Sequence, residues 1–152
     1  MCSPVQDKFA AHDKMGKIIV FKGLVAVNNQ AYDSFGDEYD KFVNWEIRLR
    51  YEMPFIEAQL GQLVGKPQVL DAACGTGMHA IALVRKGFHV AGADLSNGMV
   101  VQSRKNADAA NLDVRFEQAG FGMLAATFGE EAFDAVLCLG NSLPHVLSEQ
   151  EL

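Results

Sequence analysis

A glycine loop between a buried strand and a helix constrains the fold of this chain more than any other feature. Residues 68–73 (QVLDAA) predict a short buried strand, and residues 75–86 predict a glycine loop that opens a helix. Gly75 and Gly77 let the backbone turn tightly and approach a ligand closely. Asp94 ends the next apolar run, nineteen positions after Gly75. This pattern predicts a ligand site at the carboxyl ends of two neighbouring parallel strands.

The rest of the chain continues the alternation of strands and helices. Residues 37–64 show helical periodicity, with Pro54 expected to kink or split the helix. The other predicted elements are strands at 88–93, 114–116 and 133–139, and helices at 96–110 and 122–131. Each strand is nearly all apolar, as is typical of a parallel sheet covered on both faces. The sequence therefore predicts an α/β fold with a doubly wound, mostly parallel sheet.

Composition and charge narrow the possible partners. The chain has a net charge of -6 and lacks the basic surface expected of a nucleic-acid binder, so small-molecule or protein substrates are expected. The three cysteines are scattered and the four histidines lack ligand spacing, which predicts no metal and a reducing, cytoplasmic setting. The apolar run at 18–27 contains Lys22 and is too short to span a bilayer. It is expected to be a strand or short helix that covers the domain.

Two ligand classes fit the glycine loop. Gly75, Gly77 and Ala80 satisfy the dinucleotide pattern GxGxxG/A, so an NAD-type oxidoreductase is one hypothesis. Asp71 disfavours it, because a carboxylate there would repel a pyrophosphate at the helix N-terminus. S-adenosylmethionine carries a sulfonium and an ammonium, which a carboxylate attracts. Asp71 is also expected to cap the loop by accepting hydrogen bonds from nearby amides.

Three segments resemble motifs of class I S-adenosylmethionine-dependent methyltransferases. Residues 69–77 (VLDAACGTG) resemble the first motif, residues 92–96 (GADLS) the acidic motif, and residues 133–138 (FDAVLC) the fourth-strand motif. The resemblance implies a Rossmann-like methyltransferase fold with S-adenosyl-L-methionine as cofactor. It also implies an N-terminal extension at 1–31, partly ordered, and the N-terminal part of the cofactor-binding domain at 32–152.

The resemblance also implies which residues bind the cofactor. Gly75 and Gly77 would hold its methionine portion, and Asp94 its ribose. The remaining expected contacts come from Asp71, Ala73, Leu95, Phe121 and Leu139. Many family members carry an acid after the third strand that bonds the adenine amine. This chain has Gly120 there, so backbone groups near Phe121 are the expected substitute, although Phe121 also fits a core position.

Two further segments are similar to glycine and sarcosine N-methyltransferases. They are residues 39–48 (YDKFVNWEIR) and residues 138–145 (CLGNSLPH). This resemblance implies that Arg48 engages the cofactor carboxylate and that Asn141 helps to hold a substrate carboxylate. A solvated helix residue is the alternative interpretation of Arg48. The leading hypothesis is a small-molecule methyltransferase that acts on an amino-acid amine such as glycine or sarcosine.

No catalytic base is assigned, because methyl transfer depends mainly on positioning the donor and the acceptor. A non-catalytic cofactor-binding module is a third hypothesis. Residues 148–151 show a capping-box pattern one residue before the end, which predicts a fold truncated after its fourth strand. The far edge of residues 133–139 is then expected to be exposed, so that the chain self-associates through this edge or is unstable.

Overall fold

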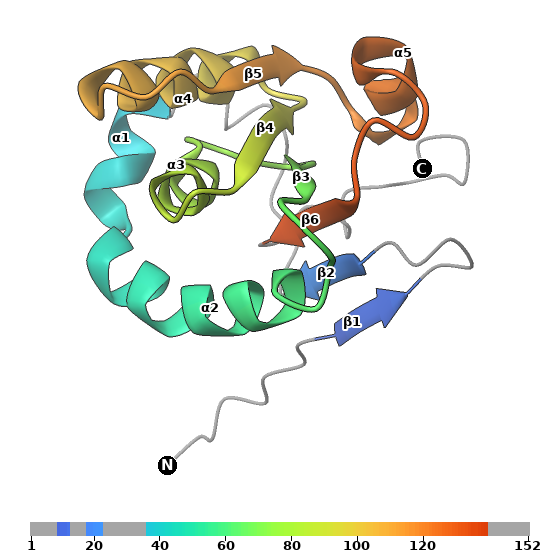
Figure 1. Ribbon diagram of the computed structural model, residues 1–152. Helices are drawn as coiled ribbons and strands as arrows, with labels where there is room; N and C mark the ends of the chain where they lie inside the picture. Colours follow the sequence, from blue (N-terminus) through green and yellow to red (C-terminus); the bar gives the residue numbers. More distant parts are fainter. Residues whose placement is uncertain (1–8, 13–17, 23–35, 140–152) are drawn as a thin grey trace.

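The computed structural model describes residues 9–12, 18–22 and 36–139 of the 152-residue chain (Figure 1). The elements, in chain order, are β1 (Phe9–His12), β2 (Ile18–Lys22), α1 (Gly36–Phe42), α2 (Trp45–Leu60), β3 (Gln68–Asp71), α3 (Met78–Arg85), β4 (His89–Asp94), α4 (Asn97–Ala109), β5 (Arg115–Gln118), the 3-10 helix η2 (Phe121–Met123), α5 (Leu124–Phe128) and β6 (Ala135–Leu139).

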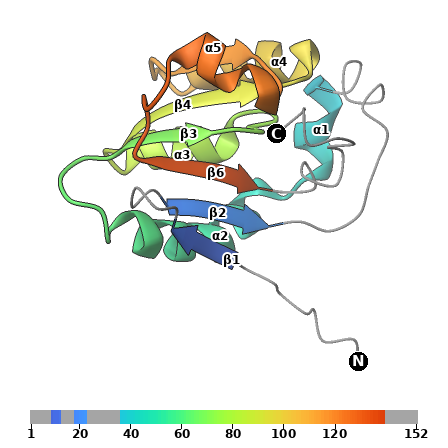
Figure 2. The same ribbon diagram turned by 90° about the vertical axis from the view of Figure 1, so that its right-hand side faces the viewer.

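The strands form one six-stranded sheet in the order β1-β2-β6-β3-β4-β5 (Figure 2). Every neighbouring pair is parallel except β1 and β2, which are antiparallel. Asp71 at the end of β3 lies opposite Gly92 in β4, two residues before Asp94. The carboxyl ends of β3 and β4 therefore meet at one edge, as the sequence predicted.

Helices cover both faces of the sheet, which confirms the doubly wound α/β fold. Figure 1 shows α2, α3 and α4 on one side and α5 on the other. On the first side, α2 and α3 bury a cluster with the strands that includes Met53, Ile56, Leu60, Leu83, Val69 and Leu137. On the second side, a cluster of Leu70, Ala72, Ala91, Ala93 and Ala119 packs against Phe121, Leu124, Phe128 and Phe133.

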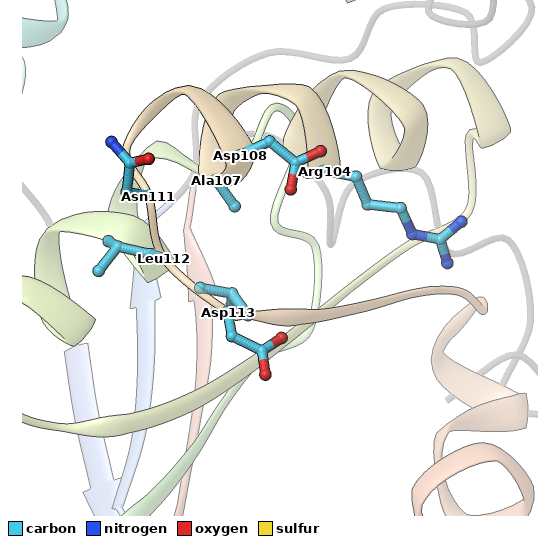
Figure 3. A pocket seen from close by; sticks show the side chains of 7 residues that line it. Arg104, Ala107, Asp108, Asn111, Leu112 and Asp113 are labelled. Atoms are coloured by element: carbon cyan, nitrogen blue, oxygen red, sulfur yellow. The ribbon is translucent and has the colours of Figure 1, made fainter.

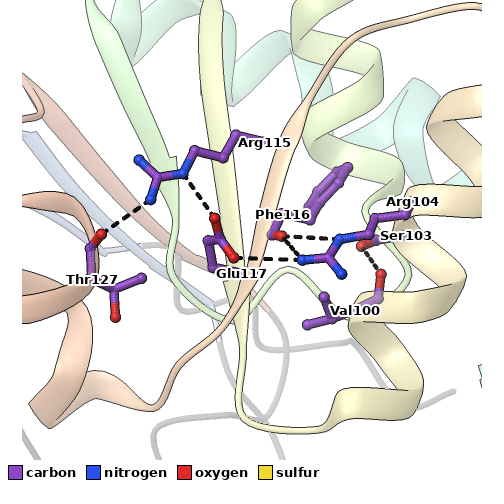
Figure 4. Close-up of polar contacts among 7 residues, drawn as sticks. All are labelled: Val100, Ser103, Arg104, Arg115, Phe116, Glu117 and Thr127. Carbon is purple, nitrogen blue, oxygen red and sulfur yellow. Dashed lines mark hydrogen bonds and ion pairs between the residues drawn. The ribbon is translucent and has the colours of Figure 1, made fainter.

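Two arginines fasten the edge strand β5 to its neighbouring helices (Figure 4). The Nε of Arg104 in α4 donates to the carbonyl of Phe116 at 3.1 Å. The Nε of Arg115 contacts Glu117 at 3.0 Å, and its other guanidinium end donates to the carbonyl of Thr127 at 3.1 Å. These bonds attach both α4 and α5 to the edge strand β5.

The long helical region divides at a different place from the one expected. The break falls at residues 43–44, where the Asn44 side chain caps α2 by accepting from the Ile47 amide at 3.1 Å. Pro54 lies inside α2 and is exposed. Of the two expected effects of Pro54, a split of the helix is wrong, because the buried apolar face of α2 stabilises the helix despite the missing amide.

The expected exposed edge of residues 133–139 is also not found. Strand β2 pairs in parallel with β6 from Ile18 opposite Ala135 to Lys22 opposite Leu139. The premise that this edge lacks a partner is therefore wrong. Strand β1 then lies outside β2, so within the described residues the outer strands of the sheet are β1 and β5. The capping-box segment 148–151 lies outside the described residues.

Candidate functional site

The glycine loop joins β3 to α3 and has a left-handed backbone at two positions. Gly75 has φ 53° and Gly77 has φ 78°. A Cβ on Gly77 would lie 2.7 Å from Phe116 Cζ and 2.8 Å from Ser103 Cβ, so packing as well as backbone conformation requires glycine there. A Cβ on Gly75 would meet no atom within 4 Å. The loop is thus tightly packed on the Gly77 side and open on the Gly75 side, where a ligand could approach.

Asp94 connects this loop to the start of α4. Its Oδ2 accepts from the Gly75 amide at 2.8 Å, and its Oδ1 accepts from the Ser96 amide at 2.9 Å. The Ser96 side chain in turn accepts from the Met99 amide and caps α4. Each carboxylate oxygen has a second lone pair, so Asp94 can accept further bonds from hydroxyl groups of a ligand.

Asp71 is a buried carboxylate, only 1% exposed, at the end of β3. Neither of its oxygens has a hydrogen-bond partner among the residues that the structure describes. Burial raises the pKa of Asp71 to about 6; His79 and Arg48 act to lower the pKa, and Asp94 acts to raise it. The expectation that Asp71 caps the loop through nearby amides is therefore wrong. A buried, unpaired carboxylate is costly, and a cationic ligand would stabilise it.

Arg48 belongs to a cluster between α2 and α3. Its Nε lies 3.3 Å from Glu52 Oε2, the same oxygen that His79 Nε2 contacts at 2.6 Å. The Arg48 guanidinium lies 5.1 Å from the centre of the Trp45 ring. The Trp45 and His79 rings pack edge to face, with their centres 5.7 Å apart. The Arg48 side chain is 26% exposed, so it lies partly buried in this cluster. The positive charge of Arg48 acts against the effect of burial on the pKa of Asp71.

The other predicted residues are distributed around the same edge of the sheet. Leu95 is exposed and lies beside Gly120, since a Cβ on Gly120 would be 3.3 Å from Leu95 Cδ1. Ala73 is half-buried in the loop, whereas Phe121 and Leu139 pack with apolar core clusters. Asn141 lies outside the described residues.

Sequence reasoning missed the residues that support this site. Glu52 and His79 are both buried, as is Thr76 within the loop. The spacing of Arg48 and Glu52, four residues apart on one helix face, could have indicated their ion pair. No local pattern indicated that His79 would face Glu52, which is 27 residues away in the sequence.

Other kinds of site have less support in the described part of the chain. No group of three or more metal-ligating side chains is found there, and no helix there is long and apolar enough to cross a membrane. Burial raises the pKa of the Cys74 thiol well above its ordinary value, so this thiol stays protonated and is a poor nucleophile.

A hollow of about 380 Å³ lies at the end of α4 (Figure 3). It is lined by Arg104, Ala107, Asp108, Asn111, Leu112, Asp113 and Val114. All of these residues precede β5, so the hollow lies at the amino end of that strand. The glycine loop and Asp94 follow the carboxyl ends of their strands, and none of the predicted site residues lines this hollow.

The family of the chain follows from comparison with known proteins. Residues 69–152 match the model of a methyltransferase domain family. This match covers more than half of the chain, so the chain belongs to that family. The family match confirms the resemblance to class I S-adenosylmethionine-dependent methyltransferases.

Individual relatives narrow the comparison. Glycine/sarcosine N-methyltransferase of Aphanothece halophytica is 37% identical over 123 residues, which are 81% of this chain and 46% of that protein. Glycine N-methyltransferase of Homo sapiens is 38% identical over 90 residues, covering 54% of this chain and 30% of that protein. The chain thus spans less than half the length of these relatives.

A solved structure supports the fold. The crystal structure of the PH0226 protein from Pyrococcus horikoshii OT3 has a TM-score of 0.60 at 26% identity and covers 72% of this chain and 50% of that one.

Proposed function

We propose that this chain binds S-adenosylmethionine and forms the cofactor-binding part of a methyltransferase whose acceptor is the amine of a small amino acid, such as glycine or sarcosine. The observation that carries the cofactor assignment is Asp71, a buried carboxylate with no hydrogen-bond partner among the described residues, beside a glycine loop open at Gly75. A ligand that brings a positive charge and no phosphate fits this combination.

The residues present fit the parts of S-adenosylmethionine. Asp71 would attract its cationic groups, and the loop at Gly75 and Gly77 would hold its methionine portion. Asp94, which accepts two backbone amides, would also accept the ribose hydroxyls. Ala73, Leu95, Phe121 and Leu139 would complete the contacts. When bound, the cofactor supplies a methyl group on a sulfonium, and the protein orients the donor and the acceptor.

Arg48 would bind the cofactor carboxylate. In this structure its guanidinium contacts Glu52 and stacks on Trp45. A guanidinium has five N–H donors, so it can keep the bond to Glu52 while it donates to a second carboxylate. Arg48 would therefore turn little on binding.

The acceptor class rests on the relatives. Proteins named glycine/sarcosine N-methyltransferase are 37% identical to this chain across about four-fifths of its length. The acidic net charge agrees with a small-molecule acceptor. Asn141 would bind the carboxylate of such an acceptor. An NAD-type dinucleotide fits less well, because its pyrophosphate would meet Asp71 at the loop.

Titration calorimetry tests the proposal. S-adenosylmethionine and S-adenosylhomocysteine should bind, and NAD should not. Asp94→Ala should weaken binding by about 1–3 kcal/mol, the usual cost of lost hydrogen bonds to a charged group. Asp108→Ala, an exposed acid at the far end of α4, serves as the matched control and should bind like the parent. The proposal would be rejected if NAD binds and S-adenosylhomocysteine does not.

Activity is measured separately, because cofactor binding does not identify the acceptor. Mass spectrometry of glycine and sarcosine incubated with the protein and S-adenosylmethionine should detect the methylated amines. Methylation of a different acceptor, with neither glycine nor sarcosine methylated, would leave the cofactor assignment intact and reject this acceptor class.

A further inference from the structure

A single carboxylate on α1 joins three other parts of the structure. Asp40 Oδ1 accepts from Thr76 Oγ1 at 2.6 Å and from Trp45 Nε1 at 2.8 Å. Asp40 Oδ2 accepts from Asn106 Nδ2 at 2.8 Å. The same Asn106 nitrogen donates to the carbonyl of Thr76 at 2.9 Å. Asp40 thus links α1 to the glycine loop, to the start of α2 and to α4.

The position of Thr76 gives this network its importance. Thr76 lies between the two left-handed glycines of the loop, and its side chain is fully buried. The strand side of the loop is fixed independently, because the Cys74 amide donates to Ala93 and the Gly75 amide donates to Asp94, each at 2.8 Å. The opposite side is fixed through the side chain and carbonyl of Thr76, which Asp40 and Asn106 hold.

We infer that Asp40 is a positioning residue for the cofactor site, an inference that rests on the proposed function. Its carboxylate fixes Thr76, and Thr76 fixes the backbone between Gly75 and Gly77 in the shape that receives the cofactor. Bonds to an ionised acceptor are stronger than bonds between neutral groups, which suits a carboxylate that restrains a mobile glycine loop. Asp40 acts through Thr76 and has no part in the chemistry of methyl transfer.

The network also couples α1 to the site. If docking of α1 raises the cofactor affinity, then cofactor binding must stabilise the docking of α1 by the same factor. The coupling is expected to pass through Asp40, since its bonds to Thr76 and Asn106 join α1 to the loop and to α4. Amides in α1 should therefore exchange more slowly when the cofactor is bound.

The experiment uses four single variants of the full chain and the double variant Asp40→Ala/Thr76→Val. Asp40→Ala removes the acceptor, Thr76→Val removes the hydroxyl with little change of shape, and Thr76→Ser restores it. Glu38→Gln removes an exposed charge from the same helix and is the matched control. S-adenosylhomocysteine affinity is measured by calorimetry, and hydrogen exchange of residues 72–79 is measured without ligand, both well below the melting temperature.

We expect Asp40→Ala and Thr76→Val each to weaken binding about tenfold and to speed loop exchange. The double variant should bind about as weakly as Asp40→Ala alone, because both substitutions remove the same bond between Asp40 and Thr76. Thr76→Ser and Glu38→Gln should match the parent. If Asp40→Ala does not fold, the comparison of Thr76→Val with Thr76→Ser decides alone.

Two outcomes would overturn the inference. One is a lower melting temperature for Asp40→Ala and Thr76→Val with unchanged affinity and loop exchange, which would make the network merely structural. The other is additive loss in the double variant. If the parent binds no S-adenosylhomocysteine, the proposed function fails, and loop exchange in the ligand-free variants still decides whether Asp40 fixes the loop.

Discussion

Ionisation of Asp71 should oppose folding of the ligand-free protein. Its pKa is about 6 in the folded state against an ordinary value of 3.8, because the side chain is buried. At about 1.36 kcal/mol for each pKa unit, this difference corresponds to about 3 kcal/mol. Between pH 4 and 6 the folded state binds more protons at this group than the unfolded state does. The contribution of Asp71 to stability therefore falls as the pH rises through this range.

The substitution Asp71→Asn tests this, because it removes the charge and keeps the shape. Urea unfolding of parent and variant is compared from pH 4.5 to pH 8. The free energy of unfolding of the variant, relative to the parent, should increase by about 2 kcal/mol over this range, since part of the effect lies below pH 4.5. The buried amide adds a cost that does not depend on pH and cancels in this comparison. Asp108→Asn, an exposed acid, should follow the parent.

The same substitution should weaken cofactor binding, because the ligand loses the attraction of an ionised partner. S-adenosylmethionine carries a sulfonium that S-adenosylhomocysteine lacks, and both carry an ammonium. If Asp71→Asn loses more affinity for S-adenosylmethionine than for S-adenosylhomocysteine, Asp71 lies by the sulfonium. If it loses the same affinity for both ligands, Asp71 lies by the ammonium. If parent and Asp71→Asn show the same pH dependence of unfolding, burial does not raise the pKa of this carboxyl and the reasoning is refuted.

Three other changes have defined outcomes. Gly77→Ala should destabilise the protein by about 2–4 kcal/mol in urea unfolding, because a side chain there is strained at positive φ and clashes with Phe116 and Ser103. An unchanged urea midpoint would contradict this packing. Glu52→Ala should lower the free energy of unfolding by about 1–3 kcal/mol, because it leaves the buried His79 ring nitrogen without its hydrogen-bond partner; an unchanged free energy of unfolding would show that this contact is dispensable. Removal of residues 1–22 should expose the edge of β6 and increase the mass measured by light scattering relative to the full chain, and an unchanged mass would mean that β2 does not protect this edge.

The parts of the site that follow from local patterns were predictable from the sequence. Gly75 and Gly77 lie in a turn whose left-handed backbone favours glycine, and Asp94 ends a strand of recognisable apolar character. Helix α4 begins at Asn97 with Ser96 as its N-cap, as the capping pattern indicated. Each of these features depends on residues within a few positions of one another, so their spacing carries the information.

The parts that depend on distant contacts were not predictable in this way. Strand β2 pairs with β6 across more than a hundred residues of sequence, and parallel pairing leaves no turn pattern to indicate it. The break before α2 came from Asn44 and not from Pro54, because packing outweighed the missing amide. The bond of Asp40 to Thr76 spans 36 residues and joins a helix to a loop. Such contacts exist only once the sheet has brought their elements together.

The carboxylates around the loop give a physical reason for the choice of cofactor. Glycine loops of this shape commonly hold phosphates, which need amide donors and positive surroundings. Here Asp94 occupies the Gly75 amide, Asp40 holds the Thr76 hydroxyl, and Asp71 lies unpaired within the described structure. A diphosphate would have to displace the first bond and face the third group. A ligand that combines hydroxyl donors with a positive charge leaves the bonds of Asp94 to Gly75 and of Asp40 to Thr76 in place. Its positive charge also offsets the cost of burying Asp71. The selectivity of this loop thus resides in its neighbouring acids more than in its glycines.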